Sequence, residues 1–290
     1  MTGVFFVQMA LETPAKVNLL LKVGPRREDG YHELATLFWP VRELCDTVDV
    51  ELRASGGVTL SCSGKADGVP CDGRNLCCKA AGAFFAATGK SVPLHIHLTK
   101  RIPVTGGMGG GSSDAAAVLL ELRRLLCPEM ATGDLRRLAV GLGADVPFFL
   151  EPVPSLARGI GEELTPVPYR GAPRLFLVHP LFPSPASWAY AHFGERSTVP
   201  DGHLERMLAA LAEGDWEDVA SCVCNDLEAC LFGKFPLLEV IRGRMEDLGV
   251  EHVHVSGSGP VLFGFETERT SPDARRILAG EFPGVLECVQ

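Results

Sequence analysis

The chain has 290 residues, 46% of them hydrophobic, which is enough for one large packed core or two ordinary ones. Its formal net charge of −9 argues against a nucleic-acid partner, because clustered lysines and arginines bind a phosphate backbone. No apolar stretch approaches the roughly 18 residues that cross a bilayer, and the start Met1–Val7 lacks the basic segment of a secretory leader. We therefore expect a cytoplasmic protein with a small-molecule substrate and no membrane partner, and the sequence leaves monomer and homodimer both open.

The spacing of the ten cysteines argues against disulfides and metal sites. Cys77 and Cys78 are adjacent, Cys222 and Cys224 are one residue apart, and no Cys-x-x-Cys pair occurs. A metal site on Cys222 and Cys224 would need a second Cys or His pair at zinc spacing, which the neighbouring sequence lacks. We expect reduced, mostly buried thiols.

The first part of the chain is predicted to be rich in strands. Val17–Val23 is apolar enough for a buried strand, and the alternation in Val48–Leu52 and Val58–Cys62 predicts a strand pair around a glycine turn. An apolar stripe at helical spacing predicts a helix over Asn75–Thr88 that ends at Gly89.

The next predicted strand, Leu94–Leu98, carries His95 and His97 on one face. Two histidines at this spacing could bind a metal, but a polar sheet face is the more frequent reason for such a pattern. We assign these histidines to no site.

This strand leads into a glycine loop, the most informative stretch of the chain. Five glycines between Gly106 and Gly111 permit positive φ angles and let backbone N–H groups converge on an anion. The residues from Ser112 to Ala117 favour a capped helix start, whose unsatisfied N–H groups and dipole attract a phosphate. A flexible linker is the alternative, but a linker is not flanked by a strand and a capped helix. The loop matches neither the Walker A nor the Rossmann pattern, so we predict a phosphate site of another class.

The remaining elements are predicted as mixed helix and strand. We expect the loop helix to reach Leu126, a helix over Asp134–Gly141, and a turn entering an apolar strand over Ala144–Leu150. Prolines concentrate between residues 152 and 185, where we expect a crossover between two domains. Three amphipathic helices and two strands are expected after it, at Leu204–Glu213, Trp216–Cys224, Pro236–Leu248, Val253–Val255 and Val261–Phe265.

Lys16 and Asn18 lie two residues apart on the first predicted strand, so their side chains share a face. A lysine in an apolar stretch either reaches the surface or meets a carboxylate or phosphate. Asn18 adds a second polar group, which favours a functional site over a surface position.

Asp145 stands in a turn before an apolar stretch. An aspartate there can simply cap the turn. It can also be a general base that takes a hydroxyl proton while a lysine keeps it ionised. Sequence spacing leaves both interpretations open.

Tyr31, His32 and Phe38 form an aromatic and polar cluster. A ring and an imidazole offer stacking and edge hydrogen bonds, which suit a nucleobase. Core packing is the alternative for any single aromatic residue. The glycine-rich turn Ser256–Pro260 is uninformative by itself.

Six motifs, taken in order, resemble one family. They are Pro14–Leu19, Asp29–Leu34, Pro103–Ala117, Leu142–Pro147, Ala157–Glu162 and Ser256–Pro260, and they extend over most of the chain. The set resembles the 4-diphosphocytidyl-2-C-methyl-D-erythritol kinase family of the GHMP kinase superfamily. Within that superfamily, Tyr31-His32 together with Gly143–Pro147 is typical of this family.

The resemblance implies a two-domain α/β (α+β) fold. A ribosomal-protein-S5-like N-terminal half would cover residues 1–155, a ferredoxin-like C-terminal half residues 156–290, and the active site would lie between them. It also implies that ATP, with Mg²⁺, phosphorylates the 2-hydroxyl of 4-diphosphocytidyl-2-C-methyl-D-erythritol on the non-mevalonate isoprenoid route. The alternatives are another superfamily enzyme, such as mevalonate kinase or diphosphomevalonate decarboxylase, and a sensor without turnover. Tyr31-His32 argues against the first, and the presence of both Lys16 and Asp145 against the second.

The resemblance also implies roles for single residues. Asp145 would be the general base, with Lys16 beside it. The substrate would contact Asn18, Tyr31, His32, Phe38 and Tyr190. The two tyrosines would stack on opposite faces of the cytosine, and His32 would form hydrogen bonds with its edge. The ATP-binding residues would be Pro103, Val104, Thr105, Gly106, Gly107, Met108, Gly109, Gly110, Gly111, Ser112, Ser113, Asn75, Leu76 and Lys100. Ser112, the first hydroxyl of the helix start, is our candidate Mg²⁺ ligand.

Three positions depart from the family's pattern. Thr105 and Met108 replace a small residue and a leucine in the loop, and Ala186 replaces a common Thr or Ser. We expect the hydroxyl contact at Ala186 to be lost or moved to Ser184 or Ser187. These departures bear on binding strength, not on reaction type.

Overall fold

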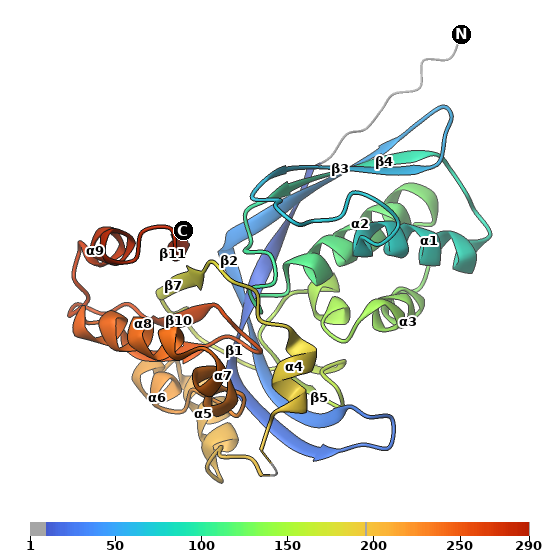
Figure 1. Cartoon of the computed structure of the whole chain (residues 1–290). Coiled ribbons are helices and arrows are strands. Elements are labelled where there is room, and N and C mark those ends of the chain that lie inside the picture. Colours follow the sequence, from blue (N-terminus) through green and yellow to red (C-terminus); the bar gives the residue numbers. More distant parts are fainter. Residues whose placement is uncertain (1–9, 195, 290) are drawn as a thin grey trace. The chain divides into compact units, whose positions relative to one another are not determined.

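The computed structural model describes residues 10–194 and 196–289 (Figure 1); the start Met1–Val7 lies outside them. The chain forms two compact units. Unit 1 runs to Ala15 and includes Val41–Val104 and Gly109–Pro152, whereas unit 2 comprises Lys16–Pro40, Thr105–Met108 and the chain from Val153 onward. The strands β1 (Ala10–Arg26) and β2 (His32–Leu52), and the glycine loop, contribute residues to both units.

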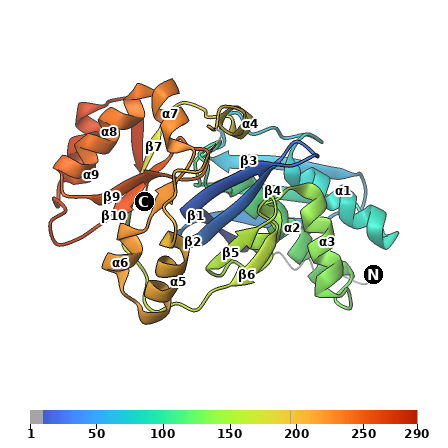
Figure 2. The same cartoon turned by 90° about the horizontal axis from the view of Figure 1, so that it is seen from below.

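Unit 1 combines a strand layer with a group of helices. Its strands follow the order β3 (Val58–Gly64), β4 (Leu94–Lys100), β2, with β3 and β4 parallel and β4 and β2 antiparallel. The helices are α1 (Leu76–Thr88), α2 (Gly110–Leu126), α3 (Thr132–Leu142) and the 3-10 helix η1 (Val146–Leu150). These helices pack on one another, and α1 packs on β3 (Figure 2). Unit 1 is therefore a mixed α/β layer structure.

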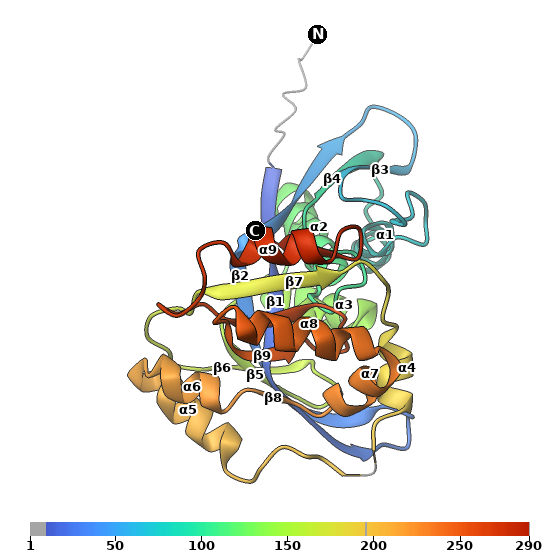
Figure 3. The same cartoon turned by 60° about the vertical axis from the view of Figure 1, so that its left-hand side comes forward.

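Unit 2 contains a second, antiparallel sheet in the order β11 (Leu286–Val289), β7 (Leu175–Pro180), β10 (Leu262–Phe265), β9 (Glu251–Val255). In the same unit β1 pairs with β8 (Cys224–Asn225), β2 pairs with β5 (Ser155–Arg158), and β5 pairs with β6 (Glu163–Pro166). The helices are α4 (Ala186–Ala191), α5 (His203–Glu213), α6 (Trp216–Ser221), α7 (Glu228–Lys234), α8 (Pro236–Asp247) and α9 (Ala274–Glu281). Helix α8 packs on β9 and α9 on β11 (Figure 3), and the fully buried Phe176, Ile241 and Leu262 belong to the core between these elements.

Local sequence rules account for the helices that were predicted well. Asn75 caps α1 by accepting a hydrogen bond from the Cys77 N–H, and Gly89 ends the helix in the left-handed conformation. Helix α2 reaches Leu126 as predicted. The strand over Val17–Val23 and the helices near residues 204–213 and 236–248 are also confirmed, and so is the mixed α/β class.

Three predictions were wrong. The segments Val48–Leu52 and Val58–Cys62 do not pair, because β4 inserts between β2 and β3. The predicted apolar strand after Ala144 is η1, since Pro147 cannot donate to a strand ladder and its fixed φ suits a first helical turn. The helix predicted to reach Cys224 ends at Ser221, after which β8 begins.

The proline-rich stretch contains β5, β6 and β7. Among the described residues, no helix combines the length and the apolar character that crossing a membrane requires.

Candidate active site

A chain of buried polar side chains starts at Lys16 on β1. Lys16 Nζ donates to Asn18 Oδ1 (2.7 Å), and Asn18 Nδ2 donates to Thr36 Oγ1 on β2 (2.8 Å). Thr36 Oγ1 in turn donates to the Leu20 carbonyl oxygen (2.7 Å). Lys16 is only 5% exposed. The predicted shared face of Lys16 and Asn18 is confirmed, and Thr36 is a member of the group that the sequence did not reveal.

The turn Ser256–Pro260 approaches these polar groups closely. A Cβ atom at Gly257 would lie 3.0 Å from Asn18 Oδ1 and 3.5 Å from Lys16 Nζ, and Gly257 has a positive φ of 56°. Glycine therefore keeps the space beside the two polar atoms open. On another side, the Lys16 ammonium lies 5.1 Å from the centre of the Phe38 ring.

The same turn holds the part of the glycine loop that belongs to unit 2. The Gly107 backbone is so close to the Ser256 carbonyl oxygen that a Cβ would come within 2.5 Å of it. The Val261 N–H donates to the Gly106 carbonyl oxygen (3.3 Å), and the Lys16 N–H donates to that of Met108 (3.0 Å). Residues 105–108 are thus attached both to β1 and to the turn.

Thr105 and Met108, two positions that depart from the family's pattern, differ in burial and in backbone conformation. Met108 is buried, so its side chain contributes to packing rather than to a ligand contact. Thr105 has a φ of 58°, which is a strained conformation for a β-branched residue. Ser184, which could replace the hydroxyl missing at Ala186, is buried and donates to the Ser258 carbonyl oxygen (2.8 Å).

An aromatic group surrounds His32 at the start of β2. Its ring stacks on Tyr190 of α4, with centres 6.4 Å apart, and meets the edge of Phe193 at 5.7 Å. His32 Nδ1 lies 3.0 Å from the Gly24 carbonyl oxygen. The neighbouring Tyr31 is 60% exposed. The structure therefore brings His32 and Tyr190 together and leaves the Tyr31 ring at the surface.

In unit 1, the start of α2 has the features of an anion site. Gly109 precedes the helix with a φ of 74°, and no side chain caps this described helix end. The prediction of a cap among Ser112, Ser113 and Asp114 was wrong, because the helix already begins at Gly110. Ser113 Oγ points inward and donates to the Pro14 carbonyl oxygen (2.7 Å), whereas Ser112 is half-buried one position earlier. Uncapped N–H groups at a helix start attract phosphate, so Ser112 is the better placed of the two hydroxyls for a ligand.

The three residues predicted to line the adenine pocket also lie in unit 1. Asn75 is buried and Leu76 is half-buried at the start of α1. The Asn75 amide is engaged, because it caps α1 and donates to the Pro70 carbonyl oxygen (2.8 Å). Lys100 is buried, and its Nζ pairs with Asp46 and with Asp114 (2.6 Å). The Lys100 ammonium is therefore occupied by two carboxylates.

Burial raises the pKa of the Asp114 carboxyl to about 7, although the Lys100 ammonium opposes this rise. Burial lowers the pKa of Lys100, but the carboxylates of Asp114 and Asp46 outweigh it and raise this pKa above the ordinary value. Three ionisable groups therefore share a nearly dry site beside the glycine loop.

Asp145 stands directly before η1 and is half-buried. Its carboxylate makes no capping hydrogen bond to this described helix start. The contact between α2 and η1 places Asp145 in the same packed group of elements as the start of the loop helix.

His95 and His97 form a polar ladder with β3. Ser61 Oγ lies 2.8 Å from both His95 Nε2 and His97 Nδ1, and Ser63 Oγ lies 3.0 Å from His97 Nε2. The interpretation as a polar sheet face is confirmed. Over residues 10–194 and 196–289, no three His, Cys, Asp or Glu side chains gather as a metal site.

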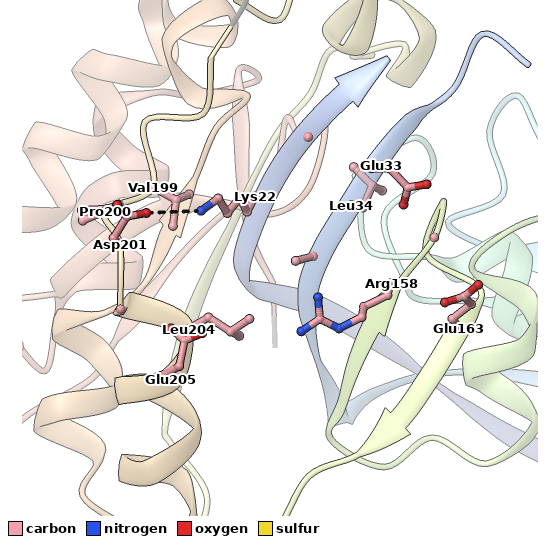
Figure 4. Close-up of a pocket in the computed structure, with 14 residues that line it drawn as sticks. Lys22, Glu33, Leu34, Arg158, Glu163, Val199, Pro200, Asp201, Leu204 and Glu205 are labelled. Atoms are coloured by element: carbon pink, nitrogen blue, oxygen red, sulfur yellow. Dashed lines mark ion pairs between the residues drawn. The ribbon is translucent and has the colours of Figure 1, made fainter. Parts of the chain in front are cut away.

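A separate pocket of about 550 Å³ lies in unit 2 and is lined by charges of both signs (Figure 4). Its lining includes the cations Lys22 and Arg158 and the acids Glu33, Glu163 and Glu205, and Lys22 points toward Asp201, with its Nζ 3.8 Å from Asp201 Oδ1. None of the residues lining this pocket was predicted as a site residue.

Comparisons with known proteins identify the family of this chain. The model of the GHMP kinases N terminal domain matches residues 75–151, and the GHMP kinases C terminal model matches residues 207–284. A 4-diphosphocytidyl-2-C-methyl-D-erythritol kinase of Pelobacter propionicus is 38% identical over 97% of this chain and 98% of its own. The enzyme of that name from Thermus thermophilus is 41% identical over 94% of each chain.

Solved structures show the same relationship. A crystal structure of 4-(cytidine 5'-diphospho)-2C-methyl-D-erythritol kinase superimposes with a TM-score of 0.73 at 39% identity, covering 97% of this chain and 98% of that one. Homoserine kinase of Cytophaga hutchinsonii, at 18% identity, shares the fold alone, with a TM-score of 0.75 over 100% of this chain and 96% of its own. The predicted GHMP kinase fold is confirmed, and this chain belongs to the 4-diphosphocytidyl-2-C-methyl-D-erythritol kinase family of the GHMP kinases.

Proposed function

We propose that this protein transfers the γ-phosphoryl group of ATP to the 2-hydroxyl of 4-diphosphocytidyl-2-C-methyl-D-erythritol. The hydroxyl oxygen forms a bond to the γ-phosphorus, the bond from that phosphorus to the β,γ-bridging oxygen breaks, and ADP leaves. The hydroxyl proton goes to the Asp145 carboxylate. Identities of 38% and 41% to kinases of that name, each over at least 94% of the chain, support the reaction.

The donor side of the site would be the glycine loop and the start of α2. The uncapped amides after Gly109 suit the oxygens of a triphosphate. Mg²⁺, when bound with ATP, neutralises negative charge on the phosphates. The half-buried Ser112 hydroxyl fits as its protein ligand, because Ser113 is already engaged with Pro14.

The acceptor side would use Lys16, Asn18 and Asp145. Lys16 and Asn18 are locked in one hydrogen-bonded chain, so they present fixed polar groups without reorganising when the substrate arrives. The Lys16 ammonium would offset the negative charge that develops as the hydroxyl loses its proton. Most of the rate acceleration would come from positioning and charge neutralisation, as in phosphoryl transfer generally.

The single observation that carries the choice of substrate is the bond between His32 and Gly24. A carbonyl oxygen can only accept, so His32 Nδ1 carries the proton and donates to it. In the neutral imidazole Nε2 is then an acceptor, which would complement the 4-amino group of cytosine and not the 4-oxo group of uracil. The exposed Tyr31 ring is available to stack on the base.

Steady-state ADP release tests the proposal, with Mg-ATP and one acceptor in each reaction. We expect release with 4-diphosphocytidyl-2-C-methyl-D-erythritol and none above background with mevalonate or homoserine. Release with mevalonate alone would keep the kinase and overturn the substrate. Binding of ATP without release in any reaction would favour a sensor.

A further inference from the structure

A buried cluster of three charges, formed by Asp46, Lys100 and Asp114, adjoins the glycine loop; we call it the stem cluster. Asp46 is fully buried, Lys100 is 4% exposed and Asp114 is 2% exposed. Lys100 Nζ pairs with Asp114 Oδ2 at 2.6 Å and also with Asp46. Two carboxylates thus share one ammonium in a site that water does not reach.

The stem cluster holds the chain where it enters the loop. Asp46 Oδ1 accepts hydrogen bonds from the N–H groups of Arg101 (2.5 Å) and Ile102 (2.9 Å). Asp46 Oδ2 faces Lys100, the residue directly before them. One carboxylate therefore fixes three consecutive residues at the entry to the loop.

The stem cluster also holds the chain where it leaves the loop. Asp114 lies one turn into α2 and is joined to Lys100. At Gly110, the first residue of α2, a Cβ would lie 3.0 Å from Ile102 Cγ2 and 3.4 Å from Asp46 Oδ2. The entry and exit of the loop are therefore packed on each other and on the same carboxylate.

A contribution to stability alone does not explain such a cluster, because the desolvation of buried ions offsets most of their mutual attraction. Buried charged groups are better explained as groups that fix the local conformation of the chain. Loop amides bind phosphate well only when they are held in place before the phosphate arrives. We propose that Asp46, Lys100 and Asp114 are positioning residues that hold the glycine loop in the conformation that binds the ATP phosphates. This inference rests on the proposed function, since it assigns the loop to ATP.

The substitution Asp114→Asn separates positioning from a direct charge effect. If the stem cluster acts only through its charge, removal of one negative charge near the phosphates should tighten ATP binding. If it positions the loop, loss of the ion pair should weaken ATP binding, by roughly 10-fold on the scale of one buried charged hydrogen bond. We expect calorimetric titration with ATP alone to show the weakening, and KM for ATP to rise by a similar factor while KM for the acceptor changes less than about 2-fold.

A second pair of variants tests Asp46. Asn at this position retains an oxygen that can accept from Arg101 and Ile102, whereas Ala does not. We expect Asp46→Ala to weaken ATP binding roughly 10-fold or more and Asp46→Asn to restore most of it. If Asp46→Ala does not fold, the Asp114→Asn titration decides alone, since its side chain keeps the same shape.

Glu121→Gln provides a matched control. Glu121 is a buried acid on the same helix, paired with Arg124 and further along α2 than the loop. We expect it to lower the thermal midpoint without changing the affinity for ATP. Unchanged or tighter ATP binding in Asp114→Asn, or equal weakening in Glu121→Gln, would overturn the inference. Failure of the wild-type protein to bind ATP would instead overturn the proposed function.

Discussion

His32 Nδ1 lies 3.0 Å from the carbonyl oxygen of Gly24, and this bond determines which hydrogen bonds the other edge of the imidazole can make. Because a backbone carbonyl cannot donate, Nδ1 carries a proton, and in the neutral imidazole Nε2 is left as an acceptor. The hydrogen bond between His32 and Gly24 therefore leads from the sequence motif Tyr31-His32 to a prediction of the base that the protein accepts.

Replacement of His32 tests this statement. The wild-type protein should prefer the cytidine substrate to its uridine analogue by roughly 10- to 100-fold in kcat/KM, because the 4-oxo group would leave two acceptors facing each other. In His32→Phe, which keeps a ring beside Tyr190, the preference should fall to within about 3-fold. Competition between the two substrates in one reaction measures the ratio directly. An unchanged preference in the variant would place the base elsewhere.

Tyr31→Ala addresses stacking on the base. We expect KM for the cytidine substrate to rise by roughly 5- to 100-fold, since stacking on one base is worth about 1–3 kcal/mol. KM for ATP should stay within about 2-fold, and Tyr31→Phe should behave like the wild type because it retains the ring. Equal KM values for the acceptor in Tyr31→Ala and wild type would remove this ring from the site.

Asp145→Asn tests the general base. Turnover should fall by about 10²–10⁴, the contribution of a positioned base, while ATP still binds. The amide has nearly the same shape as the carboxylate, so a loss of folding is not expected to complicate the result. Near-normal turnover would show that Asp145 does not take the proton.

Thr36→Val tests the polar chain that begins at Lys16. Removal of the hydroxyl leaves the buried Asn18 amide without the acceptor at 2.8 Å. The free energy of unfolding should fall by about 1–3 kcal/mol, measured by urea denaturation. Thr36→Ser, which keeps the hydroxyl and lacks only the methyl group, should retain most of that stability, and an unchanged free energy of unfolding in Thr36→Val would show that this hydrogen bond does not stabilise the fold.

The cysteines should differ sharply in reactivity. Burial, as the largest cause, raises the pKa of both Cys62 and Cys224 to about 12, so at pH 8 only roughly one thiol in 10⁴ is a thiolate. Cys71 is exposed. Mass spectrometry after brief exposure to iodoacetamide at pH 8 should find Cys71 modified well before Cys224, and comparable rates at the two positions would contradict the assigned burial.

Local rules predicted the parts of the fold that depend on neighbouring residues. Helix α1 has its Asn75 cap and its Gly89 stop within the helix sequence itself, so its ends could be predicted. The order of β3, β4 and β2 could not, because β3 pairs with a strand that follows more than thirty residues later, at residues 94–100. The segment after Asp145 was assigned to a strand because apolar character outweighed the helix-start preference of Pro147.

The same distinction applies to the site. Lys16 and Asn18 share a strand face, so two-residue periodicity was enough to link them. Thr36 joins them from a position 18 residues away from Asn18, and Lys100 meets Asp46 across 54 residues. Nothing in the local sequence around Thr36 and Asp46 distinguishes them from ordinary strand residues, so only the folded structure identified these two.

A phosphorus NMR time course can follow the transfer of phosphate to the 2-hydroxyl directly. Purified protein with Mg-ATP and 4-diphosphocytidyl-2-C-methyl-D-erythritol should produce ADP and one new phosphomonoester resonance, while the diphosphate signals of the cytidine compound persist. A parallel reaction with mevalonate should remain unchanged. A phosphomonoester in the mevalonate reaction only, or ADP without a new phosphomonoester in either, would contradict the proposed transfer.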